Sequence, residues 1–184
     1  MKRQAAKVAL AVLGIPVLVG LVGGNAIAAE TVLLRYRGFG RTVPVTDLAT
    51  LAETGEAPAS VSGLLRTANQ DSAGLQDVLT RSLTVDPNLL SQALNSWPGE
   101  LVLDQVGEAI RPPSGQASRQ ALRSALVLSA AEDGQITLLE VLERYPTPQV
   151  VLEGDRIENA YNQLANLLAP LSILKGTWEA IIGL

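Results

Sequence analysis

Proline, glycine and helix-capping residues recur along the chain at intervals of roughly ten to twenty residues and limit it to short helices. Asp86-Pro87 is a typical helix start, because aspartate accepts hydrogen bonds from free N–H groups and proline has no N–H to satisfy. Pro98-Gly99 and the segment 112–115 interrupt the pattern again. Between these breaks, leucine, valine and alanine recur at three- and four-residue steps. The pattern predicts amphipathic helices packed around one core.

Three further segments give stronger helix signals. The stretch Ala121–Ala131 is apolar almost all round and is predicted to be the central, most buried helix. Thr137 and Glu140 have the spacing of a capping box before an apolar pair. Asp155 is expected to open the longest helix, which Pro170 should kink or end.

Two segments near the beginning have the composition of strands. Thr31–Tyr36 and Arg41–Val45 are rich in β-branched and aromatic residues and flank the glycine-containing segment Arg37–Gly40, which predicts a β-hairpin. Prolines at 146 and 148 favour an extended path, so Gln149–Glu153 is a candidate third strand. The chain is therefore predicted to be mainly α, a multi-helix orthogonal bundle with a small N-terminal β-hairpin.

The first residues are typical of a secretory signal peptide. Three cations precede an apolar run from Val8 to Val22, and Ala26–Ala28 has the small-x-small pattern of a cleavage site. The run of 15 residues is shorter than the roughly 20 residues that cross a bilayer. We expect export to the periplasm or beyond the cell after cleavage near Ala28. An uncleaved anchor is the alternative, and it would be the chain's only contact with a membrane.

The expected domain organisation follows from that leader. Residues 1–28 form the signal peptide, residues 29–154 a helical domain with an N-terminal hairpin, and residues 155–184 a C-terminal helix and tail that packs on the domain or extends from it. Without the leader's three cations, the acidic excess rises from four to seven. That balance argues against nucleic acid as a partner, because phosphates attract basic patches.

The chain contains neither histidine nor cysteine. A Ser-His-Asp or Cys-His centre, a disulfide framework and the common zinc sites are therefore excluded, and no cofactor or metal is expected. No G-x-S-x-G nucleophile elbow is present either. The sequence thus predicts that the chain is not an enzyme.

Two other patterns contain residues that could act as catalytic groups. Ser172–Lys175 matches S-x-x-K but lacks the partner motifs of penicillin-recognising enzymes. Glu132-Asp133 and the pair Glu153 and Asp155 could serve glycoside cleavage. Both pairs border turns or helix starts, where the helix dipole favours acidic residues, so a structural role is expected.

The hairpin carries the best candidate for a binding surface. Arg35, Arg37 and Arg41 surround the turn together with Tyr36 and Phe39. Arginine and aromatic side chains are enriched at the energetic centres of interfaces. The alternative is an edge strand whose charges prevent sheet-to-sheet aggregation.

Several segments in order carry a family resemblance: ETVLLRYRGFGRTVPVTDLATLAETGE (30–56), LTVDPNLLSQALNSWPGE (83–100), VGEAIRPPSGQASRQALRSALVLSAAEDG (106–134) and ITLLEVLERYPTP (136–148). Over about residues 30–160 the chain resembles the cyanobacterial helical domain of unknown function number 1400. In longer relatives that domain lies ahead of an α/β-hydrolase domain. The resemblance implies that the hydrolase label belongs to the following domain.

The functional prediction combines these points. We expect an exported, non-catalytic helical module that binds a partner, such as a separately encoded hydrolase or another envelope protein. The alternatives are a carrier or lid for an apolar ligand, or a free-standing esterase of the α/β-hydrolase family.

Overall fold

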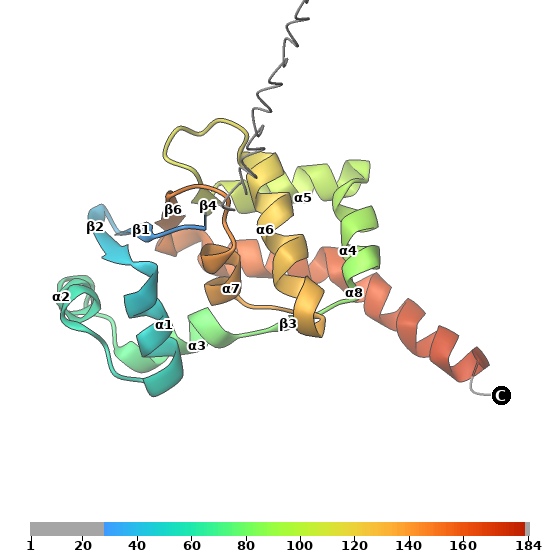
Figure 1. Cartoon of the computed structure of the whole chain (residues 1–184), viewed down its shortest axis with the longest axis horizontal. Helices are drawn as coiled ribbons and strands as arrows, with labels where there is room; N and C mark the ends of the chain where they lie inside the picture. The colour runs from blue at the N-terminus through green and yellow to red at the C-terminus, as the bar shows by residue number, and fades with distance from the viewer. Residues whose placement is uncertain (1–27, 183–184) are drawn as a thin grey trace, which may run out of the picture.

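The computed structural model describes residues 28–182, with only the backbone described for residues 171–182 (Figure 1). The strands are β1 (Thr31–Tyr36), β2 (Phe39–Pro44), β3 (Leu83–Thr84), β4 (Ile110–Arg111), β5 (Gln135–Ile136) and β6 (Gln149–Glu153). The helices are α1 (Val45–Thr54), α2 (Ala59–Ala68), α3 (Ser72–Thr80), α4 (Pro87–Leu94), α5 (Trp97–Gly107), α6 (Ser118–Asp133), α7 (Leu138–Glu143), the 3₁₀ turn η1 (Gly154–Arg156) and α8 (Ile157–Ile182). The predicted mainly α class with an N-terminal hairpin is confirmed.

The larger sheet pairs a strand from the beginning of the domain sequence with a strand from its end. Its strand order is β2-β1-β6-β4, so the candidate strand Gln149–Glu153 lies beside β1 and pairs with it in parallel. The pairs β1–β2 and β4–β6 are antiparallel. Strands β3 and β5 form a separate antiparallel pair. The sequence does not predict β3, β4 or β5, because a strand of two residues is too short to show alternation.

The hairpin turn is tighter than predicted. Only Arg37 and Gly38 lie between the strands, with φ angles of 46° and 82°, so β2 begins at Phe39. Two successive positive φ angles match the twist of a two-residue hairpin, and glycine adopts such an angle without steric cost. The N–H of Arg37 donates to Asp155 Oδ2 at 2.8 Å, which ties the turn to η1.

Alternation along the strands gives the sheet two different faces. Val32 and Leu34 in β1 and Leu152 in β6 point to the inner face and are buried in the core. Arg35 and Glu153 are paired in register and point to the outer face. Helices α1 and α7 pack against each other and lie with α3 on the inner side, as Figure 1 shows below the sheet.

The helix boundaries confirm most of the capping signals. Asp86 accepts hydrogen bonds from the N–H groups of Asn88 and Leu89, with Pro87 at the first helical position. Thr137 and Glu140 form the predicted capping box of α7. Glu140 also accepts a hydrogen bond from the buried hydroxyl of Ser129 at 2.7 Å, so the box joins α7 to α6.

The central helix and the last helix complete the core. Helix α6 buries Ala121, Leu122, Ala125, Leu126, Ser129 and Ala130, in agreement with its predicted central position. Helix α8 begins at Ile157 rather than at Asp155 and packs through Ala160, Leu164 and Leu168 against the same core. Of the two alternatives for Pro170, a kink or an end of the helix, the end is wrong, because α8 continues past this proline. A proline removes one hydrogen bond, which the neighbouring turns of a long helix tolerate.

Helix α2 was not predicted. It follows Pro58, and no side chain caps its first turn, so the sequence gives no polar start signal there. Its buried residues are Val61, Leu64 and Leu65. Among the described residues, no helix is both long enough and apolar enough to span a membrane.

Candidate functional site

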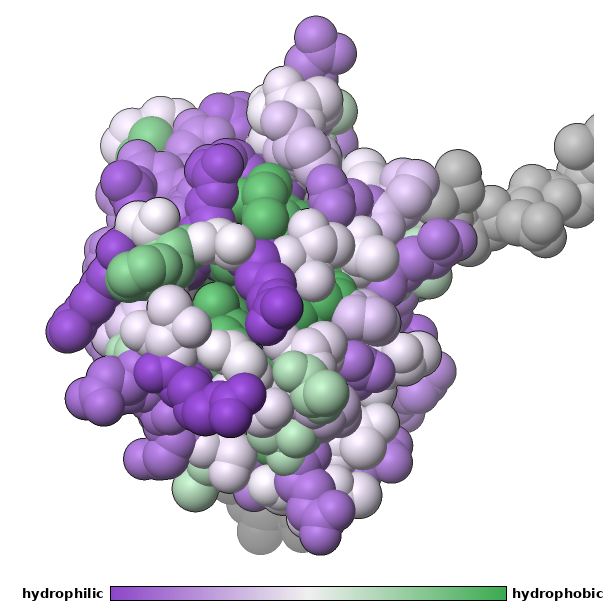
Figure 2. Space-filling view, turned by 90° about the vertical axis from the view of Figure 1, so that its left-hand side faces the viewer, coloured by the Kyte–Doolittle hydropathy of each residue, from purple (hydrophilic) through white to green (hydrophobic). Residues whose placement is uncertain are grey.

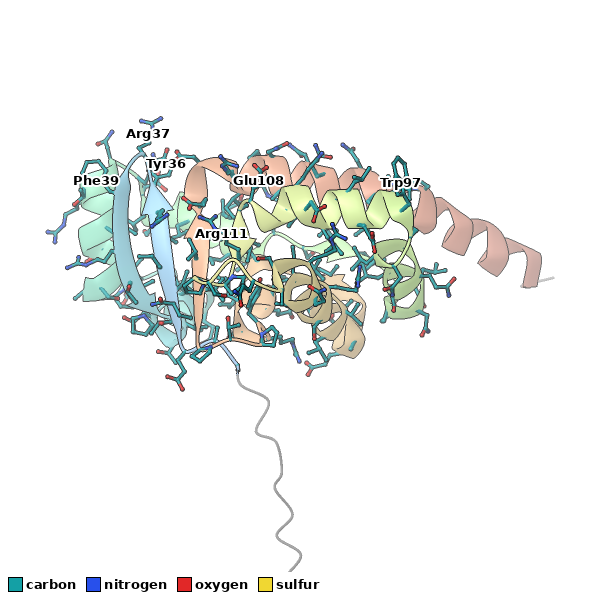
Figure 3. The ribbon with its side chains drawn as sticks, turned by 90° about the horizontal axis from the view of Figure 1, so that it is seen from above. Tyr36, Arg37, Phe39, Trp97, Glu108 and Arg111 are labelled. Atoms are coloured by element: carbon teal, nitrogen blue, oxygen red, sulfur yellow. The ribbon has the colours of Figure 1, made fainter. Side chains whose placement is uncertain are left out.

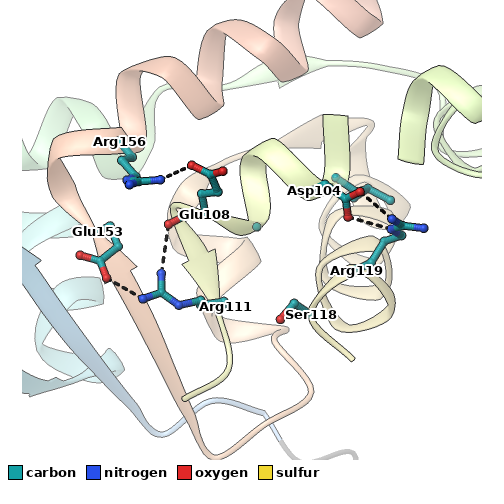
Figure 4. A pocket seen from close by; sticks show the side chains of 9 residues that line it. Asp104, Glu108, Arg111, Ser118, Arg119, Glu153 and Arg156 are labelled. Carbon is teal, nitrogen blue, oxygen red and sulfur yellow. Dashed lines mark hydrogen bonds and ion pairs between the residues drawn. The ribbon is translucent and has the colours of Figure 1, made fainter. Parts of the chain in front are cut away.

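A cleft of about 500 Å³ lies where the end of α5, strand β4, the start of α6 and the end of β6 meet (Figure 4). We call it the polar cleft. Three carboxylates and three guanidinium groups line it, together with Ser118. The six charged residues are Asp104, Glu108, Arg111, Arg119, Glu153 and Arg156.

One side of the polar cleft is a chain of ion pairs around β4. Arg111 donates to the carboxylate of Glu153 at 2.8 Å and to the backbone carbonyl of Glu108 at 3.0 Å. Arg156 pairs with the Glu108 carboxylate. Strand β4 positions Arg111 for these bonds, because its antiparallel pairing with β6 puts Arg111 opposite Val151, on the outer face that also carries Glu153.

The other side of the polar cleft is one bidentate ion pair between Arg119 and Asp104. Arg119, near the start of α6, donates through Nε and Nη2 to the two carboxylate oxygens of Asp104 at 2.9 and 2.5 Å. It also reaches Glu100 at 3.2 Å. The hydrogen bonds from Arg119 hold the pKa of Asp104 below its ordinary value and raise the pKa of Arg119. Asp104 is therefore an ionised hydrogen-bond acceptor over a wide pH range.

The chemistry of these groups favours binding over proton transfer. Ser118 lies between the two sides and donates its hydroxyl to the carbonyl of Gly115 at 2.9 Å, so this bond does not hold it against a general base. A general acid needs a pKa near the working pH, and the lowered pKa of Asp104 is unsuited to that role. Within the described part of the chain, no cluster of three or more acidic side chains is arranged to hold a metal ion.

A second hollow, of about 450 Å³, opens at the hairpin. We call it the hairpin hollow. Its lining includes Arg35, Tyr36, Phe39, Glu153 and Asp155. The side of the molecule formed by the hairpin and α2 shows charged side chains around smaller apolar areas (Figure 2). Glu153 lines both the hairpin hollow and the polar cleft, so the two hollows are neighbours.

The structure separates the five hairpin residues that the sequence singles out. Arg35, Tyr36 and Phe39 line the hairpin hollow. The guanidinium of Arg37 lies 5.3 Å from the centre of the Tyr36 ring, at the tip of the hairpin (Figure 3). Arg41 points to the other face and lies against Gly63 of α2. It is therefore not part of the hollow.

A third hollow, of about 190 Å³, lies between β1, α2 and α3 and is mainly apolar. Leu64, Leu75 and Leu138 are among its lining residues. At its edge the Tyr36 hydroxyl accepts a hydrogen bond from Gln70 at 3.3 Å. The polar cleft and the hairpin hollow therefore hold most of the charged groups that could recognise a ligand.

Sequence reasoning missed the polar cleft. Its residues lie between positions 103 and 156 in and around five elements, α5, β4, α6, β6 and η1, and no local motif joins them. The one available signal was the pair Glu153 and Asp155, for which the sequence favoured a structural role. Of the other pair, Glu132 binds Arg144 at 2.8 Å, and Asp133 accepts the N–H of Gln135. The side chains of Ser172–Lys175 lie outside the described residues.

The fold and the cleft define a mainly α domain with a polar, ligand-sized cleft on the outer side of its sheet. A family model described as "Alpha/beta hydrolase of unknown function (DUF1400)" matches residues 28–153, more than half of the chain, and the chain belongs to this family. No curated protein and no solved structure matches it.

This membership corrects the functional prediction. The family is described as hydrolases, so the predicted non-catalytic, partner-binding module is wrong. The prediction rested on the absence of histidine and of a G-x-S-x-G elbow. Those absences exclude one kind of nucleophilic centre, and they do not exclude that the chain belongs to a family of hydrolases.

Proposed function

We propose that this DUF1400 chain recognises an uncharged, hydroxyl-rich substrate in the polar cleft. The observation that carries the proposal is the balance of charge in the cleft, where three carboxylates face three guanidinium groups and bind one another. An ionic ligand finds no excess charge of either sign there. Its family, described as hydrolases, supports a substrate as the ligand.

The paired groups keep hydrogen-bonding capacity for such a ligand. A carboxylate offers about four lone-pair sites, and a guanidinium offers five N–H donors. The bond from Arg156 uses only Oε2 of Glu108, and the bond from Arg111 uses only Oε1 of Glu153. A hydroxyl group both donates and accepts, so it can bind either type of side chain without breaking the ion pairs.

The size of the cleft supports the same ligand class. Small-molecule sites usually enclose about 300–1,000 Å³, and the polar cleft measures about 500 Å³. Its walls are mostly charged, whereas sites for apolar ligands are lined mainly by apolar side chains. A sugar or another polyol fits both the volume and the lining.

Calorimetric titration of the full-length chain tests the proposal. The probes are neutral monosaccharides and polyols, each matched by a sugar acid and a sugar phosphate. We expect the neutral compounds to bind more tightly than their charged counterparts. Asp104→Asn removes the charge of an acceptor in the cleft and should weaken their binding roughly tenfold, because hydrogen bonds to ionised groups are about twice as strong as neutral ones.

Asp77→Asn is the matched control. Asp77 also pairs with an arginine, Arg81 at 2.8 Å, but it lies on α3 outside the polar cleft. Its replacement should leave binding unchanged. Preferential binding of the charged probes, or equal effects of the two variants, would contradict the proposal.

Export remains a further proposal. A periplasmic or extracellular location after cleavage of the leader is supported by the cation–apolar–small-residue order of residues 1–28. An ester and glycoside hydrolysis screen of the purified chain complements the titrations, because saturable turnover would show that the ligand of the polar cleft is a substrate.

A further inference from the structure

The polar cleft and the hairpin hollow are joined through one residue on one face of the sheet. Glu153 lines both. Arg35 of β1 lies opposite Glu153 in the parallel register, and Arg111 of β4 lies on the other side of β6, opposite Val151. The two arginines bind the same oxygen of Glu153, Oε1, at 3.3 and 2.8 Å, and neither bond uses Oε2. Glu153 is therefore held between the hollows with one oxygen available to a ligand.

From this continuity we propose that the hairpin hollow is a second subsite for the substrate of the polar cleft, and that the substrate is a neutral oligosaccharide of at least two units. The inference rests on the proposed function and extends it from one hydroxyl-rich unit to a chain of such units. Glu153 lies at the junction between neighbouring units.

The hairpin hollow supplies the surface that the polar cleft lacks. Phe39 lines the hollow and is 50% exposed. A sugar ring has a face of C–H groups that packs on the π-face of an aromatic side chain. Trp97 is also exposed, but it lies at the other end of the molecule (Figure 3). Phe39 lines the hairpin hollow from the edge strand β2, where it stands opposite Tyr36, the other aromatic residue of that lining.

The hairpin hollow, like the polar cleft, balances its arginines with carboxylates. Arg35 pairs with Glu153, and Asp155 accepts the N–H of Arg37. Over the two hollows together, four arginines face four carboxylates: Arg35, Arg111, Arg119 and Arg156 with Asp104, Glu108, Glu153 and Asp155. A ligand that covers both hollows therefore meets no net charge. This favours a neutral oligosaccharide over a charged polymer.

A chain-length series tests the inference on the full-length protein. The probes are β-1,4-linked glucose and β-1,4-linked N-acetylglucosamine, each from one to four units, titrated by calorimetry. At least one trimer should bind roughly tenfold or more tightly than its monosaccharide. Phe39→Ala should reduce the affinity for the trimer roughly two- to tenfold, the range expected for an aromatic contact, and leave monosaccharide binding unchanged. Phe39 is half exposed, so the variant should fold.

Trp97→Ala is the matched control, because Trp97 is 74% exposed but lies away from both hollows. It should bind every probe like the unaltered protein. If affinity does not rise with length, or if Phe39→Ala leaves the gain intact, the second subsite is refuted, while monosaccharide binding that Asp104→Asn weakens would keep the proposed function. If no member of either series binds, both fail. A neutral hexapeptide that binds more tightly than every oligosaccharide would overturn the inference in favour of a peptide.

Discussion

Leu152 and Glu153 are neighbours in β6, point to opposite faces of the sheet and contribute differently to the molecule. Leu152 is 1% exposed and belongs to the core cluster on the inner face. The side chain of Glu153 is 21% exposed and binds two arginines on the outer face. The comparison separates two functions of one strand. The inner face stabilises the fold, and the outer face arranges groups for a ligand.

The largest expected loss of stability comes from a substitution on the inner face. Leu152→Ala should lower the free energy of unfolding by about 2–5 kcal/mol, because it removes buried methyl groups and leaves a cavity. Leu152→Met is the matched control and should cost less than about 1.5 kcal/mol, since it nearly conserves volume. Urea denaturation measures both. A loss below 1 kcal/mol for Leu152→Ala would mean that the inner face is not the stabilising one.

The inner face was largely predictable from the sequence. The apolar and β-branched residues of Thr31–Tyr36 and Gln149–Glu153 mark both segments as strands, and Asp86-Pro87 and Thr137 mark two helix starts by side-chain chemistry. These signals act within a few residues, so they are visible in the sequence. The parallel pairing of β1 with β6 is not, because it joins segments 118 residues apart.

The outer face could not be predicted for the same reason. Arg35 and Arg111 lie 118 and 42 residues from Glu153, and only the register of three strands brings them to one carboxylate. Arg119 meets Asp104 across two helices, 15 residues apart. The hairpin signal placed Arg35, Tyr36 and Phe39 together near one turn, and all three line one hollow. It gave no indication that this hollow continues into another.

A smaller effect on stability is expected on the outer face. Glu153→Gln keeps the size of the side chain but removes its charge, and should cost about 1 kcal/mol, because both ion pairs are partly exposed. The cost should decrease at 1 M salt, where charges are screened over about 3 Å. Urea denaturation at two ionic strengths measures it. A cost as large as that of Leu152→Ala would remove the difference between the two faces.

Double-mutant cycles measure separately how much Arg111 and Arg35 contribute to the stabilisation by Glu153. The coupling of Glu153 to Arg111 should exceed its coupling to Arg35, because the first pair is closer, 2.8 against 3.3 Å, and Arg111 is the less exposed arginine. The cycles combine Glu153→Gln with Arg111→Gln and, separately, with Arg35→Gln. Each coupling should lie within about 1 kcal/mol. Equal couplings would indicate that Arg35 holds Glu153 as firmly as Arg111 does.

The smallest effect on stability is expected at Asp104 in the polar cleft, where Arg119 binds its carboxylate. The hydrogen bonds from Arg119 lower the pKa of Asp104 below its ordinary value of 3.8, so the folded state binds fewer protons there than the unfolded state does. The stabilisation is therefore complete above about pH 4 and is lost as the pH falls through the lowered pKa. Carboxyl NMR titration should place the midpoint of Asp104 below 3.8 and return it toward that value in Arg119→Gln. An unchanged midpoint in the variant would show that Arg119 does not hold Asp104 ionised, and the polar cleft would then lack its most firmly charged acceptor.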